Sequence, residues 1–191
     1  MFDCKVDRRP NRLTFPGVEI TGLIYESANS LVYRAFRQPD SLPVVLKVLK
    51  ENYPTPQELA RYRTEYKTTQ SLNLSGCIKA YDLQPYQNTL VMFVEDFGGE
   101  SLKIWMQQQK FSIEEFLRIA IASTESLQQI HSAHIIHKDI SPSNIVFNPA
   151  SGELKIINFG ISTQLTRENY TLKNPNILEG TLAYMSPKPA E

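Results

Sequence analysis

The chain alternates apolar runs with polar, turn-forming segments, and two of the runs have the length of strands. Residues 43–49 are apolar except for Lys47, and residues 89–94 form a second apolar run. Short apolar runs bounded by turn residues are typical of buried strands. Because side chains alternate across a strand, Val45 and Lys47 share one face, where the lysine either extends to water or meets an anion.

Two capping boxes predict the starts of helices. Residues 55–58 read Thr-Pro-Gln-Glu, with proline at the first helical position, so we predict a helix that runs to about Leu72. Residues 112–115 read Ser-Ile-Glu-Glu and open a second helix, which we predict to reach about His131 and to be the longest. Its first half, residues 116–122, is apolar nearly all round, so we expect this part of the helix to be buried.

Composition and charge restrict the class of protein. The chain has 191 residues, 41% of them hydrophobic, and a net charge of zero. This length suggests one or two compact units, and zero charge argues against nonspecific nucleic-acid binding. No apolar run approaches the roughly 20 residues that span a bilayer, and the N-terminus lacks the apolar core of a signal peptide. We therefore expect a cytoplasmic protein without a membrane partner, in which Cys4 and Cys77 are reduced thiols.

The most specific motif is His-Lys-Asp-Ile-Ser-Pro-Ser-Asn at residues 137–144, which is followed by Asn-Phe-Gly at residues 158–160. These segments resemble the catalytic loop H-R-D-x-x-x-x-N and the metal-binding D-F-G of protein kinases. Phosphoryl transfer needs a carboxylate near the attacking hydroxyl and ligands for the metal that neutralises the phosphates. The resemblance implies that Asp139 is the base or orienting residue and that Asn144 and Asn158 are ligands of Mg²⁺.

The resemblance extends to an ATP site in the first half of the chain. It implies that Lys47 pairs with the α and β phosphates and that Glu65, on the first predicted helix, positions this lysine. The alternative for Glu65 is an ordinary solvated glutamate. Residues 95–99 correspond to the family's hinge, whose backbone holds adenine, with Val94 as gatekeeper; the alternative is a simple loop. The other implied nucleotide contacts are Ile24, Ser27, Ser30, Val32, Val45, Glu95, Phe97 and Val146.

Several positions depart from the family pattern. Tyr25, Ser27 and Ser30 replace the three glycines of G-x-G-x-x-G-x-V, although Val32 fits the pattern. Glycine lets the backbone approach phosphate closely, so this loop is predicted to cradle phosphate less well. Asn158 offers a neutral carbonyl oxygen where the family has a carboxylate, which weakens the site for a hard dication.

Further departures lie in the catalytic loop and near the end of the chain. Lys138 lacks the planar fork of the family's arginine, and Ser141 stands where Ser/Thr kinases carry a lysine. Residues 180–187 resemble the end of the activation segment, but residues 186–188 read Ser-Pro-Lys in place of A-P-E. Because the later kinase helices do not follow, we expect a truncated domain whose helix at 116–130 exposes an apolar face.

A zinc site is the alternative function for the three histidines, which are spaced by three. His131, His134 and His137 lack a cysteine or carboxylate to complete a tetrahedral set. The kinase resemblance already uses His137 to open the catalytic loop. We therefore predict no zinc site at these positions.

The resemblance implies an α+β, protein-kinase-like fold. We expect a polar leader at residues 1–17, an antiparallel-sheet N-lobe with one helix at 18–97, and a partial helical C-lobe at 98–191. The nearest likeness is to the Ser/Thr kinase module of large bacterial multidomain signalling proteins. The implied function is ATP-dependent phosphoryl transfer to Ser or Thr of proteins, impaired in this chain. The implied partners are ATP with Mg²⁺, a protein substrate, and the missing C-lobe or downstream regulatory modules.

Two other functions stay open at this point. The first is a pseudokinase, a module that binds nucleotide or a partner without catalysis. The second is a truncated fragment with no independent role.

Overall fold

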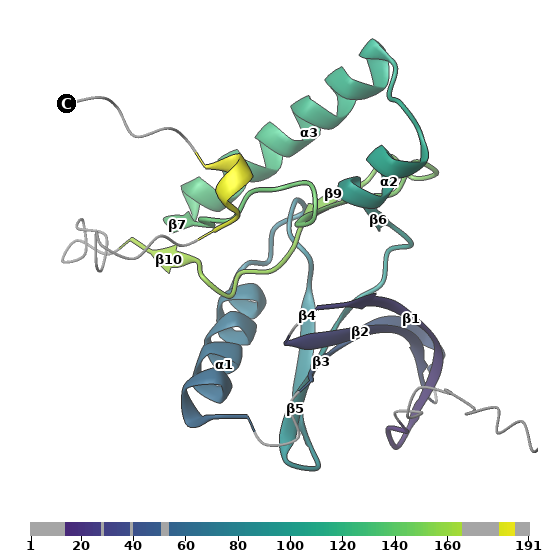
Figure 1. Cartoon of the computed structure of the whole chain (residues 1–191), viewed down its shortest axis with the longest axis vertical. Coiled ribbons are helices and arrows are strands. Elements are labelled where there is room, and N and C mark those ends of the chain that lie inside the picture. The colour runs from purple at the N-terminus through teal and green to yellow at the C-terminus, as the bar shows by residue number, and fades with distance from the viewer. Residues whose placement is uncertain (1–13, 28, 39, 51–53, 166–179, 186–191) are drawn as a thin grey trace, which may run out of the picture.

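The computed structural model of the chain has two lobes, a sheet-rich one and one that holds two helices and several short strands (Figure 1). The residues it describes are 14–27, 29–38, 40–50, 54–165 and 180–185. The predictions for residues 1–13 of the leader, for Cys4 and for the Ser-Pro-Lys at residues 186–188 lie outside the described residues.

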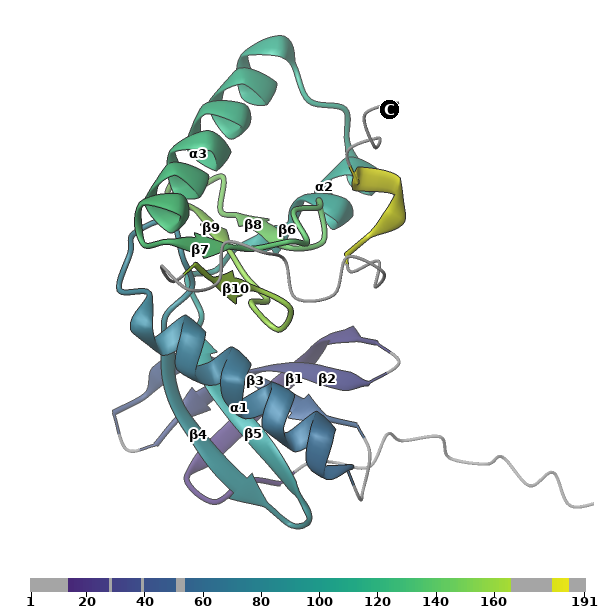
Figure 2. The same ribbon diagram turned by 90° about the vertical axis from the view of Figure 1, so that its left-hand side faces the viewer.

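The first lobe is a five-stranded antiparallel sheet in the order β1-β2-β3-β5-β4, with α1 beside it (Figure 2). Its elements are β1 (Val18–Glu26), β2 (Ser30–Arg37), β3 (Leu42–Leu49), α1 (Pro56–Ser71), β4 (Ala80–Tyr86) and β5 (Thr89–Glu95). The predicted sheet and its helix are confirmed. Pro85 lies on the edge strand β4, where a missing N–H is tolerated.

The burial of β3 follows the alternation read from its sequence. Val44 and Leu46 are buried in the core of the first lobe, whereas Val45 and Lys47 lie on the opposite face and are half-buried. The interior strand β5 is buried at each of residues 90–93, because side chains cover both of its faces. The face that carries Lys47 is therefore the face toward α1.

α1 begins at the predicted capping box and ends one residue before the predicted end. Thr55 Oγ1 accepts the N–H of Glu58 at 3.2 Å, and the Glu58 carboxylate accepts the N–H of Thr55 at 2.8 Å. Tyr62, on the buried side of the helix, donates its hydroxyl proton to the carbonyl oxygen of Lys47 at 2.5 Å. This contact fixes α1 against β3 and thereby positions Glu65, on the same helix, relative to Lys47.

The second lobe combines helices with short strands. Its elements are β6 (Glu100–Ser101), α2 (Leu102–Gln108), α3 (Ile113–Ser132), β7 (Ile135–Ile136), β8 (Ile145–Phe147), β9 (Leu154–Ile156), β10 (Thr163–Gln164) and the 3₁₀ turn η1 (Leu182–Tyr184). β6, β8 and β9 form an antiparallel sheet, and β7 pairs with β10. The predicted partial helical lobe is thus present, with short strands added to its helices. Strands this short leave little alternation to read in the sequence.

α3 is the longest of the described helices and begins at the second capping box, as predicted. Its Ile119 and Ile130 are buried. The predicted exposed apolar side is also present, with Ile113 80%, Phe116 59%, Leu117 50% and Ile121 58% exposed. Among the described residues, no helix has both the length and the apolarity needed to cross a membrane.

The two lobes share one hydrophobic cluster, which we call the shared core. Leu72 and Cys77, from the segment between α1 and β4, pack with Ile130 of α3, Ile156 of β9 and Phe159. Backbone hydrogen bonds extend the contact, since the Ile156 N–H donates to the carbonyl of Gly76 at 2.9 Å. Burial raises the pKa of the Cys77 thiol to about 12, so this thiol stays protonated and serves as a packing group.

Candidate functional site

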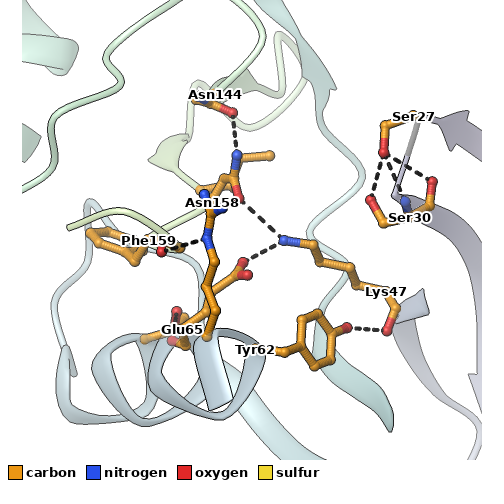
Figure 3. Close-up of polar contacts among 12 residues, drawn as sticks. Ser27, Ser30, Lys47, Tyr62, Glu65, Asn144, Asn158 and Phe159 are labelled. Carbon is orange, nitrogen blue, oxygen red and sulfur yellow. Dashed lines mark hydrogen bonds and ion pairs between the residues drawn. The ribbon is translucent and has the colours of Figure 1, made fainter. Parts of the chain in front are cut away.

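Predicted site residues from both lobes form one series of hydrogen bonds (Figure 3). Lys47 Nζ pairs with Glu65 Oε1 at 2.5 Å and donates to Asn158 Oδ1 at 3.2 Å. Asn158 Nδ2 donates to Asn144 Oδ1 at 3.2 Å. Asn144 Nδ2 then donates to Asp139 Oδ2 at 2.8 Å. We call these five residues the polar network; it joins β3 and α1 to the catalytic loop of the second lobe.

The two ends of the polar network fix the orientation of its amides. A lysine ammonium only donates hydrogen bonds and a carboxylate only accepts them. The oxygen of Asn158 must therefore face Lys47, and the nitrogen of Asn144 must face Asp139. This leaves the oxygen of Asn144 to accept from the nitrogen of Asn158. The side-chain oxygen of each amide thus accepts a hydrogen bond from the protein itself.

The ion pair of the polar network is shielded from water. The side chains of Lys47 and Glu65 are only 21% and 9% exposed. Arg61, one turn before Glu65, donates from Nε to the carbonyl oxygen of Gly160 at 3.2 Å, so α1 also contacts the Asn-Phe-Gly segment. The solvated alternative for Glu65 does not hold, because this glutamate is buried and paired.

Asp139 is held by two further hydrogen bonds from a residue whose role the sequence did not suggest. Thr181 donates to Asp139 Oδ1 from its backbone N–H at 2.9 Å and from its hydroxyl at 2.6 Å. Both carboxylate oxygens of Asp139 therefore have partners, Asn144 on one side and Thr181 on the other. The preceding residue, Gly180, has φ of +114°, and a Cβ there would lie 2.5 Å from the carbonyl oxygen of Lys138. Only glycine brings the backbone this close to the catalytic loop.

His137, the first residue of the catalytic loop, is buried and bonds to the backbone of that loop. The N–H of Asp139 donates to its Nδ1 at 3.2 Å, so the ring proton lies on Nε2, which is 2.9 Å from the carbonyl oxygen of Ile157. The ring meets Phe159 edge to face at a centroid distance of 4.9 Å. Burial is the main cause that lowers the pKa of His137, because charging the ring would cost desolvation free energy.

This environment predicts a pH-dependent stability. The unfolded chain takes up a proton on His137 near the ordinary imidazole pKa of about 6.5, whereas the folded protein takes it up only at lower pH. The melting temperature should therefore fall as pH drops below about 6.5 and should level off below the lowered folded pKa. Thermal melts between neutral and mildly acidic pH check this. His137→Gln should lose this part of the dependence of melting temperature on pH, and His131→Gln, at an exposed position, should keep it.

The described residues of the loop between β1 and β2, 27, 29 and 30, bond their backbone N–H groups within the loop. Ser27 Oγ accepts the N–H of Ser30 at 2.9 Å and the N–H of Asn29 at 3.2 Å, and its backbone N–H donates to the carbonyl of Ser30 at 2.9 Å. In the family pattern these positions belong to a glycine loop whose backbone covers phosphate. Here the hydroxyl of Ser27 already occupies two of the N–H groups.

The predicted hinge uses its side chains to join the lobes. Both carboxylate oxygens of Glu95 contact Lys155 Nζ of β9, at 2.9 and 2.8 Å, and this ammonium lies 5.3 Å from the centre of the Phe97 ring. Arg34 of β2 pairs with Asp96 at 2.7 Å, which ties the hinge to the first lobe. The structure thus directs the Glu95 side chain to a lysine of the second lobe. Part of the hinge backbone is also bonded within the protein, since the Phe97 carbonyl accepts from Asn148 Nδ2 at 2.7 Å and the Glu95 N–H donates to the carbonyl of Lys79 at 2.9 Å.

The predicted apolar contacts to adenine are half-buried and come from both lobes. Val32 lies opposite Lys47 in the β2–β3 pair, and Val45 lies opposite Val94 in the β3–β5 pair. Val146 of β8 packs under the hinge, where a Cβ on Gly99 would lie 2.7 Å from its Cγ1. Ile24 lies at an irregularity of the β1–β2 register, between Leu23 and Tyr25.

The predicted Mg²⁺ ligands do not form a site suited to a dication. Asn144 and Asn158 are neutral, and the side-chain oxygen of each already accepts a hydrogen bond. Mg²⁺ is usually bound through carboxylates and phosphates. Over the described ranges, no three His, Cys, Asp or Glu side chains are grouped to hold a metal ion. The residues present therefore do not fit the dication that the resemblance implies.

Comparisons with known proteins agree with this arrangement. The family model described as "Protein kinase domain" matches residues 21–189. The chain is 28% identical to the probable serine/threonine-protein kinase pknA2 of Bifidobacterium longum, over 88% of the chain and 22% of that protein. It is 30% identical to the serine/threonine-protein kinase pkn3 of Myxococcus xanthus, over 90% of the chain and 33% of that protein. It is 28% identical to the serine/threonine-protein kinase PrkC of Bacillus subtilis, over 77% of the chain and 22% of that protein. The chain thus spans a third or less of the length of these relatives.

Proposed function

The chain belongs to the protein kinase domain family, and we propose that it is a Ser/Thr-type domain that binds ATP between its lobes while transferring phosphoryl groups poorly. The polar network is the observation that carries this proposal. It links the lysine that pairs with phosphate in the family to the loop that bears Asp139. Such a link spans both lobes and serves no obvious need of either lobe alone.

Binding of ATP is supported by the surroundings of Lys47. The ammonium has three N–H bonds, and two are used by Glu65 and Asn158, which leaves one for a phosphate oxygen. Half-buried Val32 and Val146 offer apolar surface for adenine from the two lobes. By resemblance, the base is oriented by the backbone groups of the hinge other than the Phe97 carbonyl and the Glu95 N–H, which bond within the protein.

Weak transfer is supported by the groups that would meet the γ-phosphate. Asp139 keeps the position of the family's catalytic aspartate, held by Asn144 and Thr181. Ser141 replaces the family's lysine, and its hydroxyl is buried without a hydrogen-bond partner among the described residues. Removing one preorganised donor to the transition state typically costs about 100- to 1000-fold in rate. Asn158 removes a second charged group.

The amide pair Asn144–Asn158 favours a second candidate function, a module that holds nucleotide or a protein partner without transfer. The oxygens of both amides accept hydrogen bonds inside the polar network, so the network forms without added ligands. The two functions differ in one observable, the appearance of phosphate on a protein substrate. A magnesium-supplemented assay with labelled ATP and a generic Ser/Thr substrate separates them, with Asp139→Asn as the control for contaminating kinases.

Binding itself is tested by replacing Lys47. Lys47→Met should weaken ATP binding at least about 10-fold, because a charge-assisted contact to phosphate is worth about 1.5–3 kcal/mol. Calorimetric titration with ATP measures the change. Lys50→Met is the matched control, since Lys50 follows the same strand but pairs with Glu26 on the exposed surface. Equal losses in both variants, or no binding by the folded parent protein, would contradict the proposal.

A further inference from the structure

The polar network has a consequence for the kind of nucleotide that the site takes, if the proposed ATP binding holds. Its positive charge comes from Lys47, which pairs with Glu65, and its second carboxylate, Asp139, is separated from Lys47 by the amides of Asn158 and Asn144. The network therefore carries one excess negative charge. With a carboxylate in place of Asn158 it would carry two. The substitution thus removes one of the charges that would attract a dication and leaves the ammonium of Lys47 less neutralised.

Compared with an aspartate, the amide of Asn158 lacks a charge and also adds a hydrogen-bond donor. Its nitrogen donates to Asn144 Oδ1, the oxygen of the second predicted metal ligand. An aspartate at the same position has no N–H to donate and would leave the Asn144 oxygen open. The side-chain oxygen of Asn158 accepts from Lys47 at 3.2 Å, so the lysine and a dication would compete for this atom. Both predicted ligand oxygens are therefore bound to groups of the protein.

We propose that the site takes adenine nucleotide as the free anion, with Lys47 as the phosphate partner and without a divalent cation. The ammonium has an N–H left for phosphate, and the amides of Asn144 and Asn158 stay hydrogen-bonded to each other. In this arrangement the cation contributes nothing to affinity, because both predicted ligands are neutral amides whose oxygens stay hydrogen-bonded to groups of the protein. Phosphate recognition depends on lysine alone.

Calorimetric titration of the full chain with ATP, in EDTA and in excess Mg²⁺, tests the proposal. We expect Mg²⁺ to give no tighter binding in the parent protein. In Asn158→Asp, Mg²⁺ should tighten binding by at least about 10-fold, the lower end of the range for ligand-shell contacts. The backbone of residue 158 has φ of +72°, a conformation that Asp adopts about as readily as Asn, so the variant should keep the local fold.

The outcomes separate this proposal from the proposed function. Binding of the parent protein that requires Mg²⁺ would overturn the cation-free proposal and leave ATP binding intact. Absence of binding in both solutions by a chain that melts cooperatively would overturn both. If Asn158→Asp does not fold, Mn²⁺ electron paramagnetic resonance on the parent protein with ATP decides. We expect no protein-bound Mn²⁺, and a stoichiometric bound signal would overturn the proposal.

Discussion

Replacing Lys155 with methionine is expected to destabilise the protein by about 3–5 kcal/mol, the cost of leaving one member of a buried ion pair without its partner. The Lys155 side chain is only 5% exposed and the Glu95 side chain 17%. Both oxygens of Glu95 contact the ammonium, and Phe97 covers it. Methionine keeps the unbranched apolar part of the side chain and removes the ammonium, so the loss reports the stranded carboxylate. Denaturant unfolding monitored by circular dichroism gives the free energy of unfolding.

Two further variants test this explanation. The double variant Lys155→Met/Glu95→Leu should recover most of the lost stability, because the stranded carboxylate is removed together with the lysine. The surface pair Glu114–Arg118 is the matched control. Its side chains are 76% and 73% exposed, so Arg118→Met should leave the unfolding midpoint unchanged. A double variant no more stable than Lys155→Met would show that the pair itself, and not the stranded charge, carries the effect.

Gly76→Ala should also be strongly destabilising, by about 3 kcal/mol, because the new methyl group has no space. Gly76 lies in the segment between α1 and β4, where a Cβ would be 2.4 Å from Ser126 Oγ and 2.7 Å from Ser126 Cα of α3. The backbone of α3 cannot yield as a flexible side chain would. The segment would have to move away from α3, which would also pull Cys77 out of the shared core.

Gly22→Ala is the control for that effect. Gly22 lies in β1, and a Cβ there meets nothing within 4 Å. Alanine also narrows the conformations open to the unfolded chain, so this variant should be neutral or slightly stabilising. Thermal melts of both variants give the comparison. Similar losses of stability in the two would mean that backbone freedom of glycine, and not the contact with Ser126, sets the cost.

The sequence predicted elements that carry their own local signals. Thr55 and Ser112 begin helices because each has a glutamate three residues later, and both capping boxes form as expected. The strand with Lys47 was predicted from the apolar run at residues 43–49, and burial follows the alternation that put Val45 and Lys47 on one face. The kinase motifs then identified Lys47, Glu65, Asn144 and Asn158 as candidates that should lie close together. Their contacts are those of the polar network, while their roles in nucleotide binding stay predictions.

Contacts between distant segments that no motif indicates were not predicted. Thr181 gives no local sign that it binds Asp139, because the contact joins two loops far apart in the chain. Lys155 gave a signal that could have been used: it stands between Leu154 and Ile156, as Lys47 stands within its own apolar strand. A lysine in such a strand needs a buried partner. The sequence alone does not say that the partner is Glu95.

The shared core has a consequence for how the protein unfolds. Leu72 and Cys77 of the first lobe lose their packing partners if the second lobe opens, and Ile156 and Phe159 lose theirs if the first lobe opens. Neither lobe can melt without exposing apolar surface of the other, so the free energies of the two are coupled. The boundary near residue 97 separates two shapes but not two folding units. A segment cut there would leave half of a core on each piece, and the lobes should unfold in a single cooperative transition.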